Sequence, residues 1–176
     1  MTGLVRRAGA GRFVDGTDVV WSVAEGQKGR RWREVRSRDG VVLSSLLLET
    51  FPDRRFAHLE LSTAAGLLTL HPEADGTLHG NAVTANGIRH VAGIPWPPGS
   101  LLVVHSSPIA LAAAAWLAGG GGGQSPGEQP VVMVNPDLVV RPATVPRAGL
   151  TRHAIDADGL PILGDARSWP LELEPD

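Results

Sequence analysis

The sequence contains no cysteine, no tyrosine and no long hydrophobic run. The missing thiols exclude disulfides, thiolate metal sites and cysteine nucleophiles, and suit a reducing compartment. The first residues lack the apolar segment of a signal peptide. The longest apolar run, residues 109–118, is far shorter than the roughly 20 residues needed to cross a bilayer. We therefore expect a cytoplasmic protein without a membrane span.

The chain also lacks a strong net charge, which is −2 over 176 residues. Such a charge provides no global field that would attract nucleic acid or an anionic membrane. Most basic residues precede Phe56, and the densest cluster is Arg30-Arg31-Trp32-Arg33, followed by Glu34. We interpret this cluster as a solvated strand face and expect no nucleic-acid partner.

Alternating polar and apolar residues, separated by turn signals such as Asp39-Gly40, predict a series of short strands. Many short strands at this spacing are typical of a roll, sandwich or barrel. The expected strands span residues 18–25, 30–36, 41–50, 56–63, 67–71, 77–83, 88–92, 101–105, 131–134, 138–141, 151–155 and 169–174.

One segment has a different character. Ser106-Ser107-Pro108 is a typical helix start, the following residues are rich in alanine, and Gly119 is a typical stop. We predict one principal helix over 107–118 that is largely buried, because it carries no charged residue. The fold class is mostly β, an antiparallel β-roll or barrel-like sheet forming a single domain over 1–176. Within this domain we expect a mobile N-terminus (1–14) and a flexible Gly-rich connector (119–129).

The centre of the chain, residues 56–84, predicts a three-stranded meander with two different faces. One face is apolar, with Leu68, Leu70, Leu78 and Ala82. The other face is polar and combines Thr69, His71, Thr77, His79 and Asn81 with Phe56, His58, Glu60 and Ser62. The polar face is either solvated or lines a cavity, and a slip of one residue in register would exchange the two faces.

The histidines on this face suggest a metal site or a proton-transfer pair, His71 and His79. No compact metal-binding motif supports the first idea, so we expect no metal. The serines do not occur in a G-x-S-x-G elbow, and the glycine run after the helix matches neither phosphate-binding nor dinucleotide motifs. We therefore expect no cofactor and cannot assign a catalytic residue.

Large aromatic surface is concentrated in five tryptophans. Because the indole N–H needs a partner, tryptophan often lines a groove rather than disappearing into a core. Trp21 and Trp32 flank one hairpin, where Arg31 or Arg33 would place a cation beside an aromatic wall. This combination suits an amphipathic ligand with an apolar body and a polar or anionic head. Ordinary core tryptophans with surface arginines are the alternative.

Four features resemble the bacterial glycolipid-binding family. They are Trp21 in the first strand, the Gly29 to Arg33 return strand, the Ser107-Pro108 step into a short helix, and the closing Asp158-Gly159-Leu160-Pro161 turn. The resemblance extends over nearly the whole chain and implies a β-roll around an apolar groove for a lipid-like molecule. It supplies no catalytic residues. The glycine-rich connector and the absence of tyrosine depart from the family pattern.

Two functions follow as hypotheses. The first is binding of a lipid-like or amphipathic small molecule in an apolar, Trp-lined cavity. The alternative is a cofactor-independent cyclase or isomerase that positions a hydrophobic, polyketide-like substrate in the same cavity. The predicted ligand-binding residues are Trp21, Trp32, Arg33, His58, Glu60, His71, His79, Asn81 and Trp96. An assembly protein that uses exposed strand edges is a third possibility, and the oligomeric state is not predicted.

Overall fold

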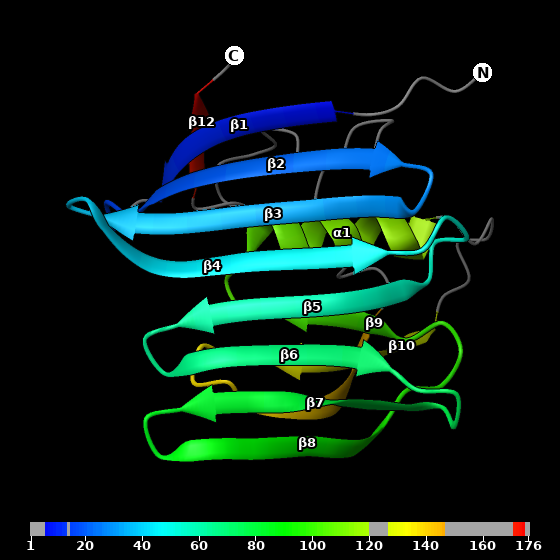
Figure 1. The fold of residues 1–176 in the computed structure, drawn as a ribbon. Helices are drawn as coiled ribbons and strands as arrows, with labels where there is room; N and C mark the ends of the chain where they lie inside the picture. Colours follow the sequence, from blue (N-terminus) through cyan, green and yellow to red (C-terminus); the bar gives the residue numbers. More distant parts are fainter. Residues whose placement is uncertain (1–5, 14, 120–126, 147–170, 175–176) are drawn as a thin grey trace.

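The computed structural model describes residues 6–13, 15–119, 127–146 and 171–174. Its main element is a nine-stranded antiparallel sheet in the order β12-β1-β2-β3-β4-β5-β6-β7-β8 (Figure 1). The strands are β1 (Arg6–Phe13), β2 (Asp18–Gly26), β3 (Gly29–Arg38), β4 (Val41–Thr50), β5 (Phe56–Thr63), β6 (Gly66–Pro72), β7 (Thr77–Thr84), β8 (Gly87–Pro95) and β12 (Leu171–Glu174).

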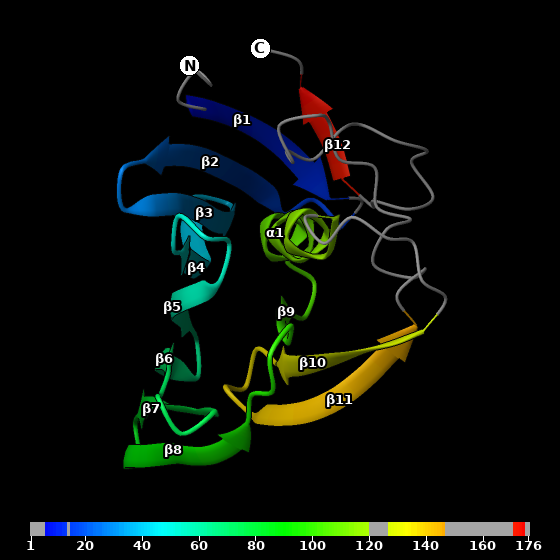
Figure 2. The same cartoon turned by 90° about the vertical axis from the view of Figure 1, so that its right-hand side faces the viewer.

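A second layer covers one side of this sheet. It contains a three-stranded sheet in the order β11-β10-β9 and the helix α1 (Pro108–Gly119). The strands are β9 (Leu101–Val104), β10 (Glu128–Val134) and β11 (Val140–Pro146), and β9 and β10 run parallel on either side of α1 in the chain. Seen edge-on, α1 and the small sheet lie on the same side of the curved large sheet (Figure 2). We call this side the inner face.

The predicted fold class is confirmed: the chain is mostly β with one principal helix. The sheet is open, because β12 and β8 are its two edges and are not paired with each other. The strand order follows the chain from β1 to β8, as hairpins with short turns require. The result is a roll-like sheet that curves around the helix and the small sheet (Figures 1 and 2).

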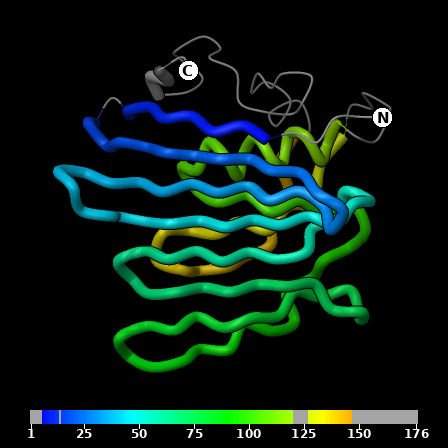
Figure 3. The backbone as a smooth tube through the Cα atoms, turned by 45° about the horizontal axis from the view of Figure 1, so that its top comes forward, coloured from blue at the N-terminus to red at the C-terminus, as the bar shows by residue number. Residues whose placement is uncertain are grey.

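The core forms where the inner face meets the second layer. Alternation along each strand turns every other side chain inward, and the meander follows the predicted register, with Leu68 opposite Ala82 and His71 opposite His79. Leu68, Leu70, Leu78 and Ala82 are fully buried in this core. The other face of the large sheet carries none of the described helices or strands (Figures 2 and 3). We call it the outer face.

Helix α1 is buried on nearly all sides, as its uncharged sequence predicts. Ile109, Ala112 and Ala113 have no exposed surface, and Trp116 packs against Trp32 with ring centroids 5.7 Å apart. Small alanine side chains let the helix approach both layers closely. The predicted Ser107 cap is confirmed, because its hydroxyl oxygen accepts a hydrogen bond from the backbone N–H of Ala110 at 3.1 Å.

The first strand was not expected, because residues 6–13 fall within the segment interpreted as a mobile N-terminus. Residues 6–12 pair continuously with β2. Their glycines, which resemble a linker in the sequence, have a packing role: a Cβ atom on Gly9 would lie 2.8 Å from the ring of Trp21. Glycine at this position lets the indole lie flat against the strand.

Two further strands have boundaries that differ from the sequence-based expectation. Strand β11 extends through Pro142 and Pro146, which is possible because it is an edge strand and proline cannot donate a ladder hydrogen bond. Strand β8, the other edge, likewise continues to Pro95. The expected strand 151–155 and most of the Gly-rich connector lie outside the described residues.

A β-bulge reverses the predicted orientation of Phe56. Glu49 pairs with His58 but Thr50 pairs with Phe56, so Ala57 is an extra residue in β5. The bulge turns Phe56 into the core, where it is 4% exposed, while His58 stays on the outer face. Sequence alternation alone had assigned both residues to one face.

Candidate functional site

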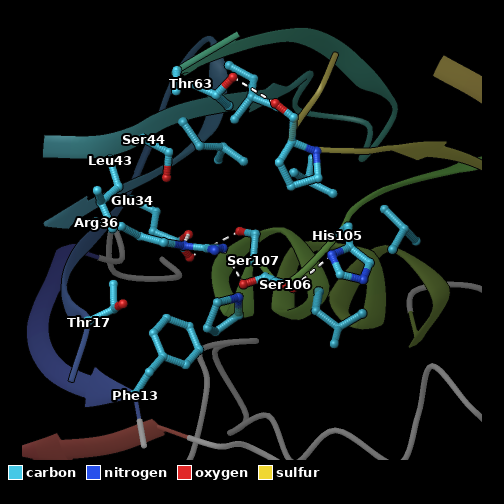
Figure 4. A pocket seen from close by; sticks show the side chains of 18 of the residues that line it. Phe13, Thr17, Glu34, Arg36, Leu43, Ser44, Thr63, His105, Ser106 and Ser107 are labelled. Atoms are coloured by element: carbon cyan, nitrogen blue, oxygen red, sulfur yellow. Dashed lines mark hydrogen bonds and ion pairs between the residues drawn. The ribbon is translucent and has the colours of Figure 1, made fainter. Parts of the chain in front are cut away.

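A cavity of about 750 Å³ lies between the inner face and the start of α1. Its apolar walls come mainly from β4, β5, β9, β10 and α1, whereas its charged groups come from β3 and the β1–β2 turn. Figure 4 shows side chains from both layers converging on this space. The lining residues are Phe13, Asp15, Thr17, Glu34, Arg36, Arg38, Leu43, Ser44, Leu46, Leu61, Thr63, Ala64, Val103, Val104, His105, Ser106, Ser107, Pro108, Leu111, Met133 and Pro136.

Glu34 is the buried charge of the cavity and ties the large sheet to the helix. Its side chain is 3% exposed. One carboxylate oxygen, Oε2, accepts hydrogen bonds from Ser107 Oγ at 3.0 Å and from the backbone N–H of Ile109 at 3.1 Å. A carboxylate at this position is favoured by the partial positive charge of a helix N-terminus. Glu34 therefore acts as a second capping group of α1, although it lies in a strand more than 70 residues earlier in the chain.

Arg36 neutralises this carboxylate from the same face of β3. Its Nε donates to Glu34 Oε1 at 2.7 Å, and its Nη2 donates to the backbone carbonyl of Ser106. The guanidinium also lies over the Phe13 ring, 5.3 Å from the centroid. These three contacts fix the orientation of the arginine, whose side chain is 16% exposed (Figure 4).

A second acid–base pair joins the β1–β2 turn to the end of β3. Arg38 Nη2 donates to Asp15 and, at 2.7 Å, to Thr17 Oγ1. The backbone N–H of Thr17 donates to Asp15 Oδ1 at 3.0 Å. This backbone hydrogen bond, together with the Thr17 hydroxyl and Arg38, holds the pKa of Asp15 below its ordinary value of 3.8. The cavity lining thus contains two carboxylates and two guanidinium groups in matched pairs.

The segment between β9 and α1 adds uncharged polar groups. Ser106 has a backbone φ of 60°, a left-handed conformation that is uncommon for residues other than glycine. Its hydroxyl lies 2.8 Å from His105 Nδ1. The first helical amides are already engaged: Ile109 N–H donates to Glu34 and Ala110 N–H donates to Ser107. These two amides are therefore not free to bind an oxyanion.

A second β-bulge shapes the wall of the cavity at β4. Arg36 pairs with Ser44 but Ser37 pairs with Val42, so Leu43 is the extra residue. Both Leu43 and Ser44 line the cavity as a result. Bulges commonly re-aim side chains beside binding sites, and this one brings two consecutive residues to the same wall (Figure 4).

None of the nine predicted site residues lines this cavity. Two of the tryptophans lie in the hydrophobic core instead, with Trp32 fully buried and Trp21 9% exposed. Both indole Nε1 atoms are buried and have no hydrogen-bond partner. Trp96 is half-buried and packs on Phe56 with ring centroids 5.4 Å apart. These three tryptophans pack in or against the hydrophobic core and do not line the cavity.

The cation beside the aromatic wall is Arg30, not Arg33. The Arg30 guanidinium is buried between Trp116, 4.2 Å from its ring centroid, and Trp32, 5.2 Å from its centroid. It also forms an ion pair with Glu25 at 2.6 Å. Arg33 is exposed because it points to the outer face. Because side chains alternate along a strand, Arg30 and Trp32 must share one face of β3, so the sequence contained this signal.

The polar face of the meander is the outer face of the sheet. His58, His79 and Asn81 are half-buried there, and Glu60 and His71 are exposed. Asn81 Oδ1 lies 2.7 Å from His90 Nδ1, and His71 Nε2 lies 3.0 Å from Glu73. The structure brings these residues together on neighbouring strands, but on the side of the sheet opposite the cavity.

The cavity residues that sequence reasoning missed are Glu34, Arg36, His105 and Ser106. Glu34 and Arg36 share their strand face with Trp32, which is the sequence signature of a charge turned towards a core. No local signal indicates that this face meets the helix start, because residues 34 and 107 are far apart in the chain. The partner of each charge depends on the tertiary fold.

Comparison with known proteins adds no identity: no family model, curated protein or solved structure matches the chain. In the described part of the chain, no helix combines the length and hydrophobicity required to cross a membrane. Among the same residues, no group of three or more metal-ligating side chains is arranged to hold a metal ion. The resemblance to the glycolipid-binding family stays a prediction from the sequence.

Proposed function

We propose that the chain binds a lipid-like or amphipathic small molecule in the cavity between β3–β5, β9 and the start of α1. The observation that carries this proposal is a volume of about 750 Å³ with mainly apolar walls and a few fixed polar groups. Ligand sites in proteins typically have volumes of roughly 300–1,000 Å³ and this kind of lining. Leu46, Leu61 and Leu111 would contact the apolar body of the ligand.

The charges of the cavity favour a polar head without strong net charge. Glu34 and Asp15 are each paired with an arginine, so neither sign is in excess among these four groups. Their remaining donors and acceptors, with Ser106 and His105, suit hydroxyl groups, which donate and accept hydrogen bonds. The resemblance to the glycolipid-binding family implies a lipid-like molecule in an apolar groove, which agrees with the apolar walls of this cavity. A simple anion is disfavoured, because it would lie beside the carboxylates of Glu34 and Asp15.

A matched pair of substitutions on β4 tests the proposal. Ser44→Trp places an indole in the cavity, whereas Ser45→Trp places one on the outer face, because Ser45 pairs with Val35. With a fluorescent alkyl glycoside as the probe, we expect Ser44→Trp to weaken binding at least tenfold and Ser45→Trp to leave it unchanged. Circular dichroism would verify that both variants fold. Equal affinity in the three proteins, or no binding of alkyl probes by the parent chain, would contradict the proposal.

The enzymatic alternative would use a different histidine from those the sequence suggested. His71 and His79 lie on the outer face, but His105 lines the cavity and contacts Ser106. A cyclase or isomerase acting in this space would therefore rely on His105 for proton transfer. His105→Gln would abolish turnover of a polyene or polyketide-like substrate. Unchanged turnover would remove His105 from the mechanism.

A further inference from the structure

Strands β9 and β10, with α1 between them in the chain, form a βαβ unit whose carboxyl ends border the cavity. The two strands run parallel, which requires a crossover such as this helix. His105 and Ser106 follow β9, Pro136 follows β10, and all three line the cavity. In open α/β sheets, ligands bind outside the carboxyl ends of parallel strands. The junction of β9 and α1 is therefore a place where reactive groups would meet a bound molecule.

Ser106 is a strained residue at this junction. Among the described non-glycine residues with a positive φ, it alone carries a hydroxyl nucleophile. Backbone outliers of this kind cluster at active sites. In hydrolases with a nucleophile elbow, the serine likewise lies on a sharp, strained turn from strand to helix, which exposes its hydroxyl. Ser106 occupies such a turn and is exposed, although its flanking residues lack the glycines of that motif.

The imidazole of His105 lies beside this hydroxyl. Ser106 Oγ is 2.8 Å from His105 Nδ1, which is within reach for a general base that takes the hydroxyl proton (Figure 4). In the neutral ring with its proton on Nε2, Nδ1 is the acceptor. The backbone N–H of His105 donates to the carbonyl of Val134 at 2.9 Å, which anchors the base to β10. The pair has the geometry of a serine activated by histidine.

Arg36 is the group that can stabilise the negative charge formed by attack on a carbonyl. The backbone amide after the nucleophile is already engaged, because Ser107 N–H donates to the carbonyl of Val104 at 3.1 Å. Arg36 Nη2 donates to the backbone carbonyl of Ser106, so its guanidinium lies directly beside the nucleophile. In the described part of the chain, this contact and the bond to Glu34 engage two of its five N–H groups. The others can donate to an oxyanion.

We propose that Ser106 is an acyl-accepting nucleophile and that the chain hydrolyses carboxylic esters with an apolar acyl chain. The inference rests on the function proposed above, because the acyl chain would lie against the apolar walls of the cavity. Ser106 Oγ bonds to the carbonyl carbon while His105 Nδ1 takes the hydroxyl proton and Arg36 donates to the oxyanion. The bond from carbon to the leaving alcohol then breaks, and His105 gives its proton to that alcohol.

Water completes the reaction. Its oxygen attacks the acyl carbon on Ser106, and His105 takes one of its protons. As the acyl bond to Ser106 Oγ breaks, His105 returns that proton to the serine. One ester and one water thus give one carboxylic acid and one alcohol, and no oxidant or reductant is needed.

Ester hydrolysis and covalent labelling test the inference. p-Nitrophenyl octanoate and p-nitrophenyl acetate differ only in the acyl chain, and we expect kcat/KM to be about tenfold or more higher for the octanoate, because added methylenes bind apolar walls. A decyl fluorophosphonate should attach to Ser106, which peptide mass spectrometry would locate. Ser106→Gly should lower kcat/KM about a hundredfold or more and abolish this labelling. Ser45→Ala, on the outer face, is the matched control and should have the parent values.

Two features of the variants separate lost chemistry from lost folding. Glycine adopts a φ near 60° without strain, so Ser106→Gly should retain the parent circular dichroism spectrum and Tm. His105→Gln should slow labelling about tenfold or more while Ser106 stays the labelled residue. A merely structural role of His105 would not slow the labelling of a folded variant in this way.

The outcomes also separate catalysis from binding. If the parent chain binds the fluorescent alkyl glycoside but is not labelled at Ser106 and does not hydrolyse the octanoate, the nucleophile is wrong and the proposed function stands. Parent kcat/KM in folded Ser106→Gly would also overturn the inference. Equal kcat/KM for the two esters would show that the acyl chain does not use the cavity, and the substrate class proposed here would be wrong.

Discussion

Glu34 shows how one residue connects two layers. A carboxylate that is 3% exposed is costly to bury unless it is paired and hydrogen-bonded. Here Arg36 supplies the opposite charge, and Ser107 and the Ile109 amide supply further donors. Because all these groups meet at one carboxylate, its loss would leave the Arg36 guanidinium without its counter-charge and the Ile109 amide without an acceptor.

Removing this carboxylate should be strongly destabilising. We expect Glu34→Ala to lower the free energy of unfolding by about 3–5 kcal/mol, the usual cost of breaking a buried ion pair. Glu34→Gln should cost less, because the amide oxygen can still accept from Ser107. Urea denaturation would measure both values. Glu60→Ala, on the exposed outer face, is the control and should change stability by at most about 0.5 kcal/mol. A similar loss in Glu34→Ala and Glu60→Ala would refute this role.

At the scale of elements, β1 illustrates how packing overrides composition. Its sequence, RRAGAGRF, has the appearance of a linker, yet it is paired with both β2 and β12. Glycine lowers strand propensity, but it also lets the neighbouring strand place a large ring against the backbone. At Gly9 that ring is the indole of Trp21. The tertiary contact thus stabilises a strand that local propensity does not predict.

A methyl group at residue 9 should lower the stability of the fold, because β1 packs closely on Trp21. The Cβ atom of Gly9→Ala would lie 2.8 Å from two ring carbons, so the indole must shift. We expect a loss of about 1–3 kcal/mol, as for other overpacked sites, and a lower Tm in differential scanning calorimetry. Gly26→Ala is the matched control, because a Cβ there meets no atom within 4 Å. If both variants had the parent Tm, the inference that β1 is stabilised by close packing on Trp21 would be contradicted.

The strands show which residue placements can be predicted from the sequence and which cannot. Alternation correctly placed Leu68, Leu70, Leu78 and Ala82 on the buried face, since a period of two is a local property of a strand. It failed at Phe56 and could not place Leu43, because each bulge depends on the register of the neighbouring strand. The cavity itself depends on which strand face meets α1. No periodicity within β3 reveals that Glu34 will meet Ser107.

At the scale of the whole molecule, the large sheet forms one curved wall of the cavity, and the start of α1 in the second layer lies opposite it. Besides the shared apolar core, polar contacts between the layers include Glu34 to Ser107, Thr63 to Pro136, and Arg89 to the carbonyl of Leu138 at 2.8 Å. The turns that join the strands of the large sheet hold acidic residues in a recurring arrangement. Stability at low pH therefore depends on these turns together.

Acid should weaken the fold through three turn carboxylates. The pKa values of Asp15, Asp53 and Asp75 are lowered from 3.8, chiefly by hydrogen bonds from the Thr17 backbone, the Arg55 side chain and the Thr77 hydroxyl, respectively. A lowered pKa in the folded state adds stability that is fully present above the unfolded value and is lost as pH falls through the folded value. Stability from these groups should therefore decline below a pH of about 4.

The test combines a triple variant with NMR titration. Asp15→Asn/Asp53→Asn/Asp75→Asn should be less stable than the parent at neutral pH, and its free energy of unfolding should fall less steeply between about pH 4 and pH 2. Thr77→Val should move the carboxyl titration of Asp75 upward, because it removes the hydroxyl donor at 2.6 Å while leaving Asp15 unchanged. Titration of all three carboxyls at or above 3.8 in the parent, or identical acid slopes in the parent and the triple variant, would show that the turns do not stabilise the fold in this way.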